Sequence, residues 1–485
     1  MSSTPQQLNG QRRAALGFWL LVALLALVAA GKEILHDTLD PDLFWHLRVA
    51  QQLRADGIGP IVDQISFASV RQPWTPYSWL AELFMEWTWR TLGWRGAVAI
   101  AAISSSVVVV LIALCCIEMA GKDRRLNCAI ATAFGAVLSL SFLSFRPVTF
   151  AIVLLGVGAW LLLRDRREPS RRVWLIVPIM TLITNLHLSA VMVPLWLACL
   201  LAGAVRERRN VKRYAILLAA SALACLATPM LPGAARAAWF YQSRDVMVAS
   251  RVIAEMQPFW SGYAGLVTAI VLIAFAMSIF TNPRPLRVGE RLWVLAAGLM
   301  MLRLGRFAPM FAYIAAPALA ITMPRLGDRA LARPIVITIL AVVSALGAVR
   351  IVWEFPPSAQ SLDEWLSRRK AAAYPVQAAE FAERNVERRS GRVITEFDWG
   401  GYVAWRLGDS WQVLLDGRTQ LYTPEFWQAT YLGDSMDVVP ILRDAHADAA
   451  ILPAHMSRFR AALDSLGWRS VYGDDVAEVL LPPLP

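Results

Sequence analysis

The sequence has few charged residues and few cysteines for its length. Asp, Glu, Lys and Arg make up 17% of its 485 residues, and hydrophobic residues make up 57%, whereas soluble domains carry about 25% charge. The five cysteines lie in or beside apolar segments without the spacing of a metal site, so we interpret them as small buried hydrophobic residues. This composition excludes an ordinary soluble domain and predicts many membrane spans.

Motifs of soluble nucleotide and hydrolase chemistry are also missing. The sequence has no Walker loop, no dinucleotide-binding glycine fingerprint, no His-Glu-x-x-His and no Gly-x-Ser-x-Gly. The net charge of +11 does not indicate nucleic-acid binding, because residues 356–485 carry 13 basic and 18 acidic side chains and the basic excess lies in short loops between apolar segments. We therefore expect no nucleic-acid partner.

Eleven apolar segments are candidate membrane spans. The first, Ala14–Gly31, has about the minimum length for a span and is longer than the core of a typical signal peptide. A cleaved signal peptide, cut near Val28-Ala29-Ala30, is the alternative. The other ten are Ala97–Ile117, Leu126–Leu143, Val148–Leu163, Val173–Ile183, Leu188–Val205, Tyr214–Leu231, Tyr263–Phe280, Leu292–Leu302, Phe307–Met323 and Pro334–Trp353.

The loops between these segments are alternately basic, which predicts the orientation. The positive-inside rule places the basic loops and the N-terminus in the cytoplasm, and the odd number of spans places the C-terminus outside. We expect a multi-pass protein of a bacterial inner membrane, with a membrane domain at 1–355, a long first outer loop at 32–81 and a periplasmic or exterior α/β domain at 356–485. Its strands are predicted at Arg392–Phe397, Gln412–Leu415, Ala449–Leu452, Ser470–Tyr472 and Val476–Leu481.

The first outer loop begins with an unusual run of acidic, aromatic and basic residues, Asp40-Pro41-Asp42-Leu43-Phe44-Trp45-His46-Leu47-Arg48. Asp42 and His46 are four residues apart, so a helix that starts near Pro41 places them on one face. Asp40 before Pro41 is also typical of a helix N-cap, and capping and function both remain open for it. Charged groups at a membrane edge are costly unless they are solvated, paired or used. Asp42, His46 and Asp40 are therefore candidate catalytic residues.

Other residues of this loop are candidates for the wall of a site. They are Asp63, Trp74 and Glu82. Trp87, Trp89 and Trp94 are typical of anchors at the membrane interface.

Four basic residues are predicted to lie in short outer turns, on the side where the positive-inside rule disfavours them. They are Arg146, His187, Arg303 and Arg306. Snorkelling of the side chains toward the interface is the alternative to a function. Because a guanidinium group pairs with phosphate oxygens through two hydrogen bonds, these residues are candidates for binding a lipid-linked phosphate.

Two corners of the C-terminal domain follow predicted strands and should meet at one sheet edge, where ligand sites favour the strand ends. The alternative is turn formation by their glycines. The segments are Glu396-Phe397-Asp398-Trp399-Gly400-Gly401-Tyr402 and Leu415-Asp416-Gly417-Arg418, which supply the candidate binding residues Asp398, Trp399, Tyr402, Asp416 and Arg418.

At these residues the chain resembles the GT-C membrane glycosyltransferases, above all the catalytic subunit of oligosaccharyltransferase. Asp42-Leu43-Phe44-Trp45-His46-Leu47-Arg48 is similar to the family motif in the first external loop, which implies that Asp42 is catalytic or binds a metal. Phe397-Asp398-Trp399-Gly400-Gly401-Tyr402 resembles the segment that contacts the acceptor. The second external loop departs from the family, since it has only Ser144-Phe145-Arg146-Pro147 where oligosaccharyltransferases carry a second acidic pair.

The resemblance implies a GT-C-like helical membrane protein that transfers a sugar from a polyprenyl-phosphate-linked donor to a glycan, lipid or protein acceptor on the outer face. Asp42 would act as general base or hold a divalent cation, Mg²⁺ or Mn²⁺, with His46 orienting it. Arg303 and Arg306 would neutralise charge on the donor phosphate, and Arg146 and His187 would assist them. Membrane lipids are the other expected partners.

Two alternatives remain. A transporter or flippase would need polar residues at mid-membrane, whereas here they cluster at one surface. A non-catalytic membrane scaffold with the same fold would also account for the missing acidic pair.

Overall fold

The computed structural model describes residues 5–483 except 36–38, 71–72, 244, 251–252, 254–255, 258–261, 283, 368–373, 387–389 and 456. Its internal contacts divide the chain into two compact units. Unit 1 comprises Met1–His36, Val98–Thr228 and Ala254–Phe355, and unit 2 comprises Asp37–Ala97, Pro229–Ile253 and Pro356–Pro485. The predicted domain boundary at 355/356 coincides with one edge of unit 2, which also takes in most of the first outer loop.

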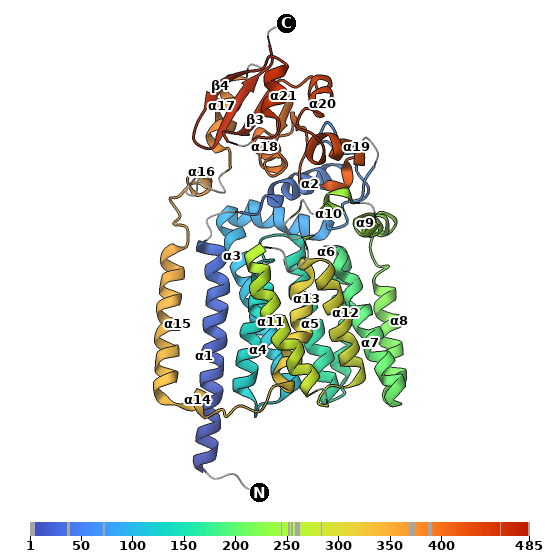
Figure 1. The fold of residues 1–485 in the computed structure, drawn as a ribbon, viewed down its shortest axis with the longest axis vertical. Helices are drawn as coiled ribbons and strands as arrows, with labels where there is room; N and C mark the ends of the chain where they lie inside the picture. The colour runs from blue at the N-terminus through green and yellow to red at the C-terminus, as the bar shows by residue number, and fades with distance from the viewer. Residues whose placement is uncertain are drawn as a thin grey trace. The chain divides into compact units, whose positions relative to one another are not determined.

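Unit 1 is a bundle of helices that run side by side (Figure 1). Within it α4 packs on α13, α1 on α15, and α7 on α12. The helices are α1 Pro5–Leu35, the part of α3 (Trp79–Ala120) after Ala97, α4 Arg125–Leu140, α5 Pro147–Arg167, η1 Arg171–Leu175, α6 Ile176–Leu186, η2 Leu188–Val191, α7 Met192–Glu207, α8 Val211–Ala224, α11 Gly262–Thr281, α12 Val288–Arg303, η4 Gly305–Phe307, α13 Ala308–Thr322, α14 Arg329–Ala332 and α15 Pro334–Glu354.

Five helical segments of the described residues are long and apolar enough to cross a membrane. They make the chain a multi-pass membrane protein and are Leu8–Leu35, Trp79–Ala120, Pro147–Arg167, Leu188–Glu207 and Pro334–Glu354. A helix also overlaps each of the other predicted spans, but apart from α11, which has 20 residues, these helices are shorter, and α6 has only 11 residues. The total of eleven crossings therefore stays a prediction.

The interior of unit 1 depends on small residues. Almost every residue of α13 is buried, because its Ala-rich sequence lets neighbouring helices approach closely. Gly156 of α5 lies against Tyr313, whose ring atoms would be 2.5 Å from a methyl group at that glycine. The Tyr313 hydroxyl donates to the Ile152 carbonyl at 3.0 Å, which satisfies a polar group deep in the bundle.

Unit 2 contains a five-stranded sheet with the order β2-β1-β3-β5-β4. β1 pairs in parallel with β2 and β3, and β5 is antiparallel to both β3 and β4. Each strand overlaps a predicted one: β1 Gly391–Thr395, β2 Trp411–Val413, β3 Ala449–Pro453, β4 Arg469–Gly473 and β5 Ala477–Leu481.

The helices of unit 2 are short apart from α2, α9 and the first part of α3, which bends at Gly93, where φ is +67°. Their bounds are α2 Asp42–Asp56, α9 Leu231–Ser243, α10 Val246–Ala249, α16 Leu362–Leu366, α17 Val376–Asn385, α18 Gly400–Leu407, η6 Thr419–Leu421, α19 Pro424–Trp427, η7 Gln428–Leu432, α20 Val439–Asp444 and α21 Arg460–Ser465.

The first outer loop extends the sheet beyond β2. The Val413 N–H donates to the Ile65 carbonyl at 2.9 Å, and the Phe67 N–H donates to the Val413 carbonyl at 3.0 Å. Ser66 Oγ adds a bond to the Leu414 carbonyl at 2.7 Å. These bonds join segments about 350 residues apart and hold the start of α2 and the ends of β1 and β2 in one compact unit.

Candidate functional site

Asp40 caps the helix that carries the acidic-aromatic run. The Asp42 N–H donates to Asp40 Oδ1 at 3.0 Å, and the Leu43 N–H donates to the Asp40 carbonyl at 3.0 Å. Pro41, with φ of −55°, starts the helix without sacrificing a hydrogen bond. The predicted capping role of Asp40 is therefore present, and Asp42 lies in the first turn of α2, where the helix dipole stabilises its negative charge.

The carboxylate of Asp42 is held from two sides. The Trp45 indole Nε1 donates to Asp42 Oδ1 at 2.9 Å. A methyl group at Gly417 would lie 2.4 Å from the same oxygen and 2.9 Å from Trp45 Nε1. Since real side-chain contacts are not that short, only glycine fits there, and the backbone at Gly417 forms a wall against the Asp42–Trp45 pair.

The glycine pair after β1 makes a second close approach to the same turn of α2. A methyl group at Gly401 would lie 3.1 Å from the Trp45 nitrogen and 3.3 Å from the Pro41 oxygen, and one at Gly400 would lie 1.8 Å from the Leu415 oxygen. α18, which begins at Gly400, packs on α2. The structure thus brings both predicted corners together around the first turn of α2.

The predicted acceptor-contact segment divides into exposed and buried residues. Asp398 is exposed and Trp399 is half-buried, whereas Tyr402 is fully buried. The Tyr402 ring packs in an aromatic cluster centred on Phe44, with ring centroids 5.0 Å apart. Of the three candidate binding residues in this segment, Asp398 and Trp399 are therefore the accessible ones.

Asp416 and Arg418 lie in the interior, in a charged cluster with Asp63 of the first outer loop. Arg418 donates to Asp416 Oδ1 through Nε at 2.9 Å and to Asp416 Oδ2 through Nη2 at 2.5 Å, and its Nη1 donates to Asp63 Oδ1 at 2.8 Å. None of the three side chains is exposed. The guanidinium group also lies over the Trp74 ring, 5.3 Å from its centroid.

The charges of this cluster stabilise one another against burial. Burial acts to lower the pKa of Arg418, but the Asp416 and Asp63 carboxylates outweigh it and raise the pKa well above its ordinary value. Burial likewise acts to raise the pKa of Asp63, but the charge and hydrogen bond of Arg418 lower it. The cluster fixes the Asp416–Arg418 corner, and with it Gly417, to the loop at Asp63.

His46 has a carboxylate partner from another helix. Its Nδ1 lies 3.2 Å from Glu82 Oε1, and both side chains are buried. Glu82 belongs to the part of α3 before the bend at Gly93, which is part of unit 2. Burial raises the pKa of Glu82 to about 8, opposed by the Arg418 charge, so its carboxyl is neutral near pH 7. His46 Nδ1 therefore contacts Glu82, whereas the hydrogen bond to Asp42 comes from Trp45.

In unit 1 three of the predicted outer-turn residues come together. They are Arg146 before α5, His187 between α6 and η2, and Arg306 in η4. Burial and then the charges of Arg306 and Arg146 lower the pKa of His187 to about 3, so its ring is neutral. Its Nδ1 accepts a hydrogen bond from the Ser189 N–H at 3.1 Å.

Each of the two arginines of this group forms a side-chain hydrogen bond. Arg146 donates to Ser144 Oγ at 2.8 Å, and Arg306 donates to Met256 Sδ at 3.2 Å. Arg303, the last residue of α12, is exposed. Two guanidinium groups beside a neutral imidazole make this end of the bundle strongly attractive to anions.

Within the part of the chain that the structure describes, no group of three or more His, Cys, Asp and Glu side chains is arranged to hold a metal ion. The Asp42 carboxylate accepts from the Trp45 indole, and the Asp40 carboxylate accepts from the Asp42 N–H. The divalent cation that the sequence resemblance implies therefore stays a prediction, and we derive no step through a metal.

No protein-family model matches the sequence, and no curated protein matches it. Solved structures do match. Archaeal oligosaccharyltransferase AglB from Archaeoglobus fulgidus, in complex with an inhibitory peptide and a dolichol-phosphate, has a TM-score of 0.57 and 12% identity over 96% of this chain and 75% of its own. ArnT from Cupriavidus metallidurans, bound to undecaprenyl phosphate, has a TM-score of 0.55 and 12% identity over 96% of this chain and 98% of its own. These likenesses confirm the GT-C fold that the sequence resemblance predicts.

Proposed function

We propose that the chain is a membrane glycosyltransferase that moves a sugar from a polyprenyl-phosphate-linked donor to an acceptor on the outer face of a bacterial inner membrane. The observation that carries the proposal is the Asp42 carboxylate, fixed by Trp45 and Gly417 at the start of α2 in a GT-C fold. The cytoplasmic N-terminus, the exterior position of residues 356–485 and the eleven crossings belong to this proposal and rest on the alternating basic loops.

Asp42 is the general base in this proposal. Its position in the first turn of α2 and the hydrogen bond from Trp45 favour the ionised form, which can accept a proton from the acceptor nucleophile. The acceptor then bonds to the anomeric carbon, the bond between that carbon and the phosphate oxygen breaks, and the polyprenyl phosphate leaves with the electron pair. Trp45 takes over the orienting role that the sequence predicts for His46.

Arg306 and Arg146 bind the donor phosphate in this proposal, with the neutral His187 as an uncharged partner and the exposed Arg303 as an additional charge. Their support is the lowered pKa of His187, to which burial contributes most and the charges of Arg306 and Arg146 contribute next. The ligands named for AglB and ArnT, dolichol-phosphate and undecaprenyl phosphate, are lipid phosphates of the kind that such a cluster would bind.

Asp398 and Trp399 are the proposed acceptor contacts because a ligand can reach them. The buried Tyr402, Asp416 and Arg418 act as positioning residues: Tyr402 packs on Phe44 of α2, and the other two hold Gly417 in place.

The experiment has two arms. Binding of undecaprenyl phosphate to the purified protein should weaken about tens- to thousands-fold in Arg306→Ala, since loss of one partner of a hydrogen-bonded charge pair costs about 2–5 kcal/mol. Arg284→Ala, which removes an exposed arginine outside this cluster, is the matched control and should bind normally. Equal binding by the two variants would contradict the donor site.

The second arm separates an enzyme from a scaffold. Mass spectrometry of cell-surface glycans should show a product that is missing from a deletion strain and restored by the wild-type chain. An unchanged glycan profile in the deletion strain would favour the non-catalytic scaffold.

A further inference from the structure

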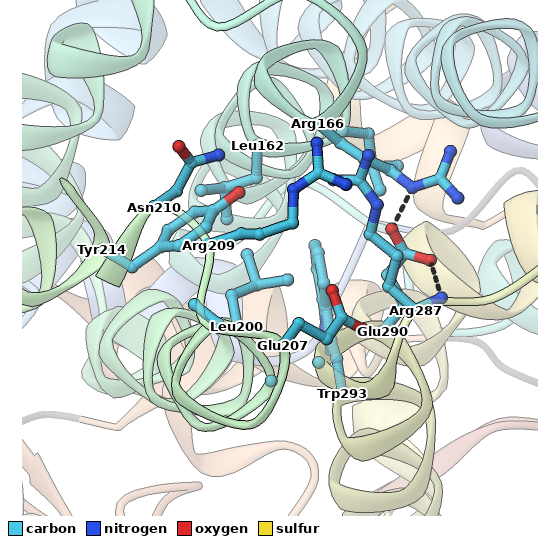
Figure 2. A pocket seen from close by; sticks show the side chains of 14 residues that line it. Leu162, Arg166, Leu200, Glu207, Arg209, Asn210, Tyr214, Arg287, Glu290 and Trp293 are labelled. Atoms are coloured by element: carbon cyan, nitrogen blue, oxygen red, sulfur yellow. Dashed lines mark hydrogen bonds and ion pairs between the residues drawn. The ribbon is translucent and has the colours of Figure 1, made fainter. Parts of the chain in front are cut away.

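A pocket lies at the other end of the helical bundle, away from the turns that hold Arg146 and Arg306. About 470 Å³ of space, part of it open to solvent, lies there between α5, α7, α8 and α12 (Figure 2). Arg146 directly precedes α5, and the pocket residue Arg166 lies near the end of that 21-residue helix. At 1.5 Å per residue the two ends are about 30 Å apart, which is the thickness of the hydrocarbon layer. The pocket therefore lies at the level of the opposite layer of lipid headgroups.

The wall of this pocket is built by a close contact between α7 and α12. A methyl group at Gly203 would lie 2.2 Å from the Gly289 nitrogen, and one at Gly289 would lie 2.9 Å from the Leu200 Cα. The two helices pack backbone to backbone at this point. The part of the pocket lining that α7 and α12 contribute is therefore held by close helix packing.

Both carboxylates of the pocket are already engaged. Glu207 Oε1 accepts from the Val288 N–H at 2.9 Å, and Glu290 Oε2 accepts from the Arg287 N–H at 2.8 Å. Glu290 also forms an ion pair with Arg166. Together these bonds satisfy the first turn of α12 and neutralise one of the three arginines that line the pocket.

The lining carries three arginines and two glutamates, so its net charge is +1. Among the described residues no carboxylate lies within ion-pair distance of Arg209 or Arg287, and both line the pocket. Figure 2 shows the arginine side chains and Leu162 on one side of the pocket, and Leu200, Trp293 and the Glu207 carboxylate on the other. A pocket that presents guanidinium groups near leucine and tryptophan side chains matches an amphiphile that carries a phosphate.

We propose that this pocket binds the phosphate headgroup of an anionic phospholipid. Arg209 and Arg287 contact the phosphate oxygens, Asn210 and Tyr214 supply further polar groups, and Leu200 and Trp293 contact the glycerol and the first methylenes. The site is independent of the glycosyl-transfer proposal, since it lies at the other end of the bundle and uses none of the same residues. Bound lipid would link α7, α8 and α12 and stabilise the bundle.

The test is the thermal unfolding of the purified full chain in neutral detergent. Phosphatidylglycerol should raise the unfolding temperature of the wild type more than phosphatidylcholine does at the same mole fraction. Arg209→Gln combined with Arg287→Gln should remove most of this difference. At about 1 kcal/mol for each basic residue near an anionic lipid, each lost arginine should weaken binding about fivefold. Arg206→Gln, an exposed arginine of the same region outside the pocket, is the matched control and should behave like the wild type.

Three results would overturn the inference. They are equal effects of the two lipids on the wild type, an equal loss in the Arg206→Gln control, and full reproduction of the stabilisation by inorganic phosphate alone, which would make a free anion the ligand.

Discussion

Gly417→Ala should disable the proposed base without touching its charge. The added methyl group would lie 2.4 Å from Asp42 Oδ1, whereas ordinary contacts begin near 3.4 Å, so the Asp42–Trp45 pair must move by about one ångström. A displacement of that size at a reacting group costs about 100-fold in rate. Overpacking should lower the free energy of unfolding by about 1–3 kcal/mol. φ at Gly417 is not positive, so the alanine variant adds no backbone strain to the effect of the methyl group.

The assay compares glycan product in a deletion strain complemented with each variant, normalised to the amount of folded protein in the membrane. Gly473→Ala is the matched control, because a methyl group there meets nothing within 4 Å and this glycine also lies in unit 2 without a positive φ. Product formation by Gly417→Ala within about twofold of this control would refute the reasoning that Gly417 sets the position of Asp42.

Three further predictions concern the surroundings of Asp42. Between the ordinary pKa of a carboxyl group and about pH 8, the free energy of unfolding should fall by about 1.4 kcal/mol per pH unit, because folded Glu82 retains a proton that the unfolded chain has released. Glu82→Gln should flatten this pH dependence in thermal melts. Parallel slopes in the variant and the wild type would contradict the prediction. Arg418→Met removes the partner of two buried carboxylates and should cost about 3–5 kcal/mol of stability. Asp63→Asn keeps the ion pair between Arg418 and Asp416 and should cost about 1–3 kcal/mol. Equal losses of stability in denaturant titrations would argue against the shared cluster. Trp45→Phe keeps the ring but removes the donor to Asp42, so the rate of product formation should fall about 10- to 100-fold with little loss of stability, and a wild-type rate would exclude this role.

Features that depend on local sequence were predictable. Short runs that contain Val, Ile, Leu or aromatic residues locate the five strands, and Asp40-Pro41 locates the start of α2. The meeting of the two glycine corners followed from the position of both segments after strands of one sheet.

The partners within the site were not predictable because they depend on long-range packing. Glu82 lies 36 residues from His46, and Asp63 lies 355 residues from Arg418. Nothing in a single sequence pairs such residues. In the sequence, Gly417 is typical of an ordinary turn. Only the structure shows that it lies against Asp42.

The outer-turn arginines show the same limit. Loop alternation predicts that Arg146, His187, Arg303 and Arg306 share one side, but it cannot say which of them are neighbours. The tertiary structure places Arg146 and Arg306 beside His187, whereas Arg303 ends α12 in an exposed position.

The most direct test of glycosyl transfer by Asp42 is product formation by Asp42→Asn beside Asp40→Asn. The two variants make the same chemical change two residues apart, and asparagine still caps a helix, so Asp40→Asn should stay close to the wild type. Asp42→Asn removes the proton acceptor while keeping its size, and it should abolish the glycan product without lowering the amount of folded protein. Undiminished product from Asp42→Asn would contradict the account.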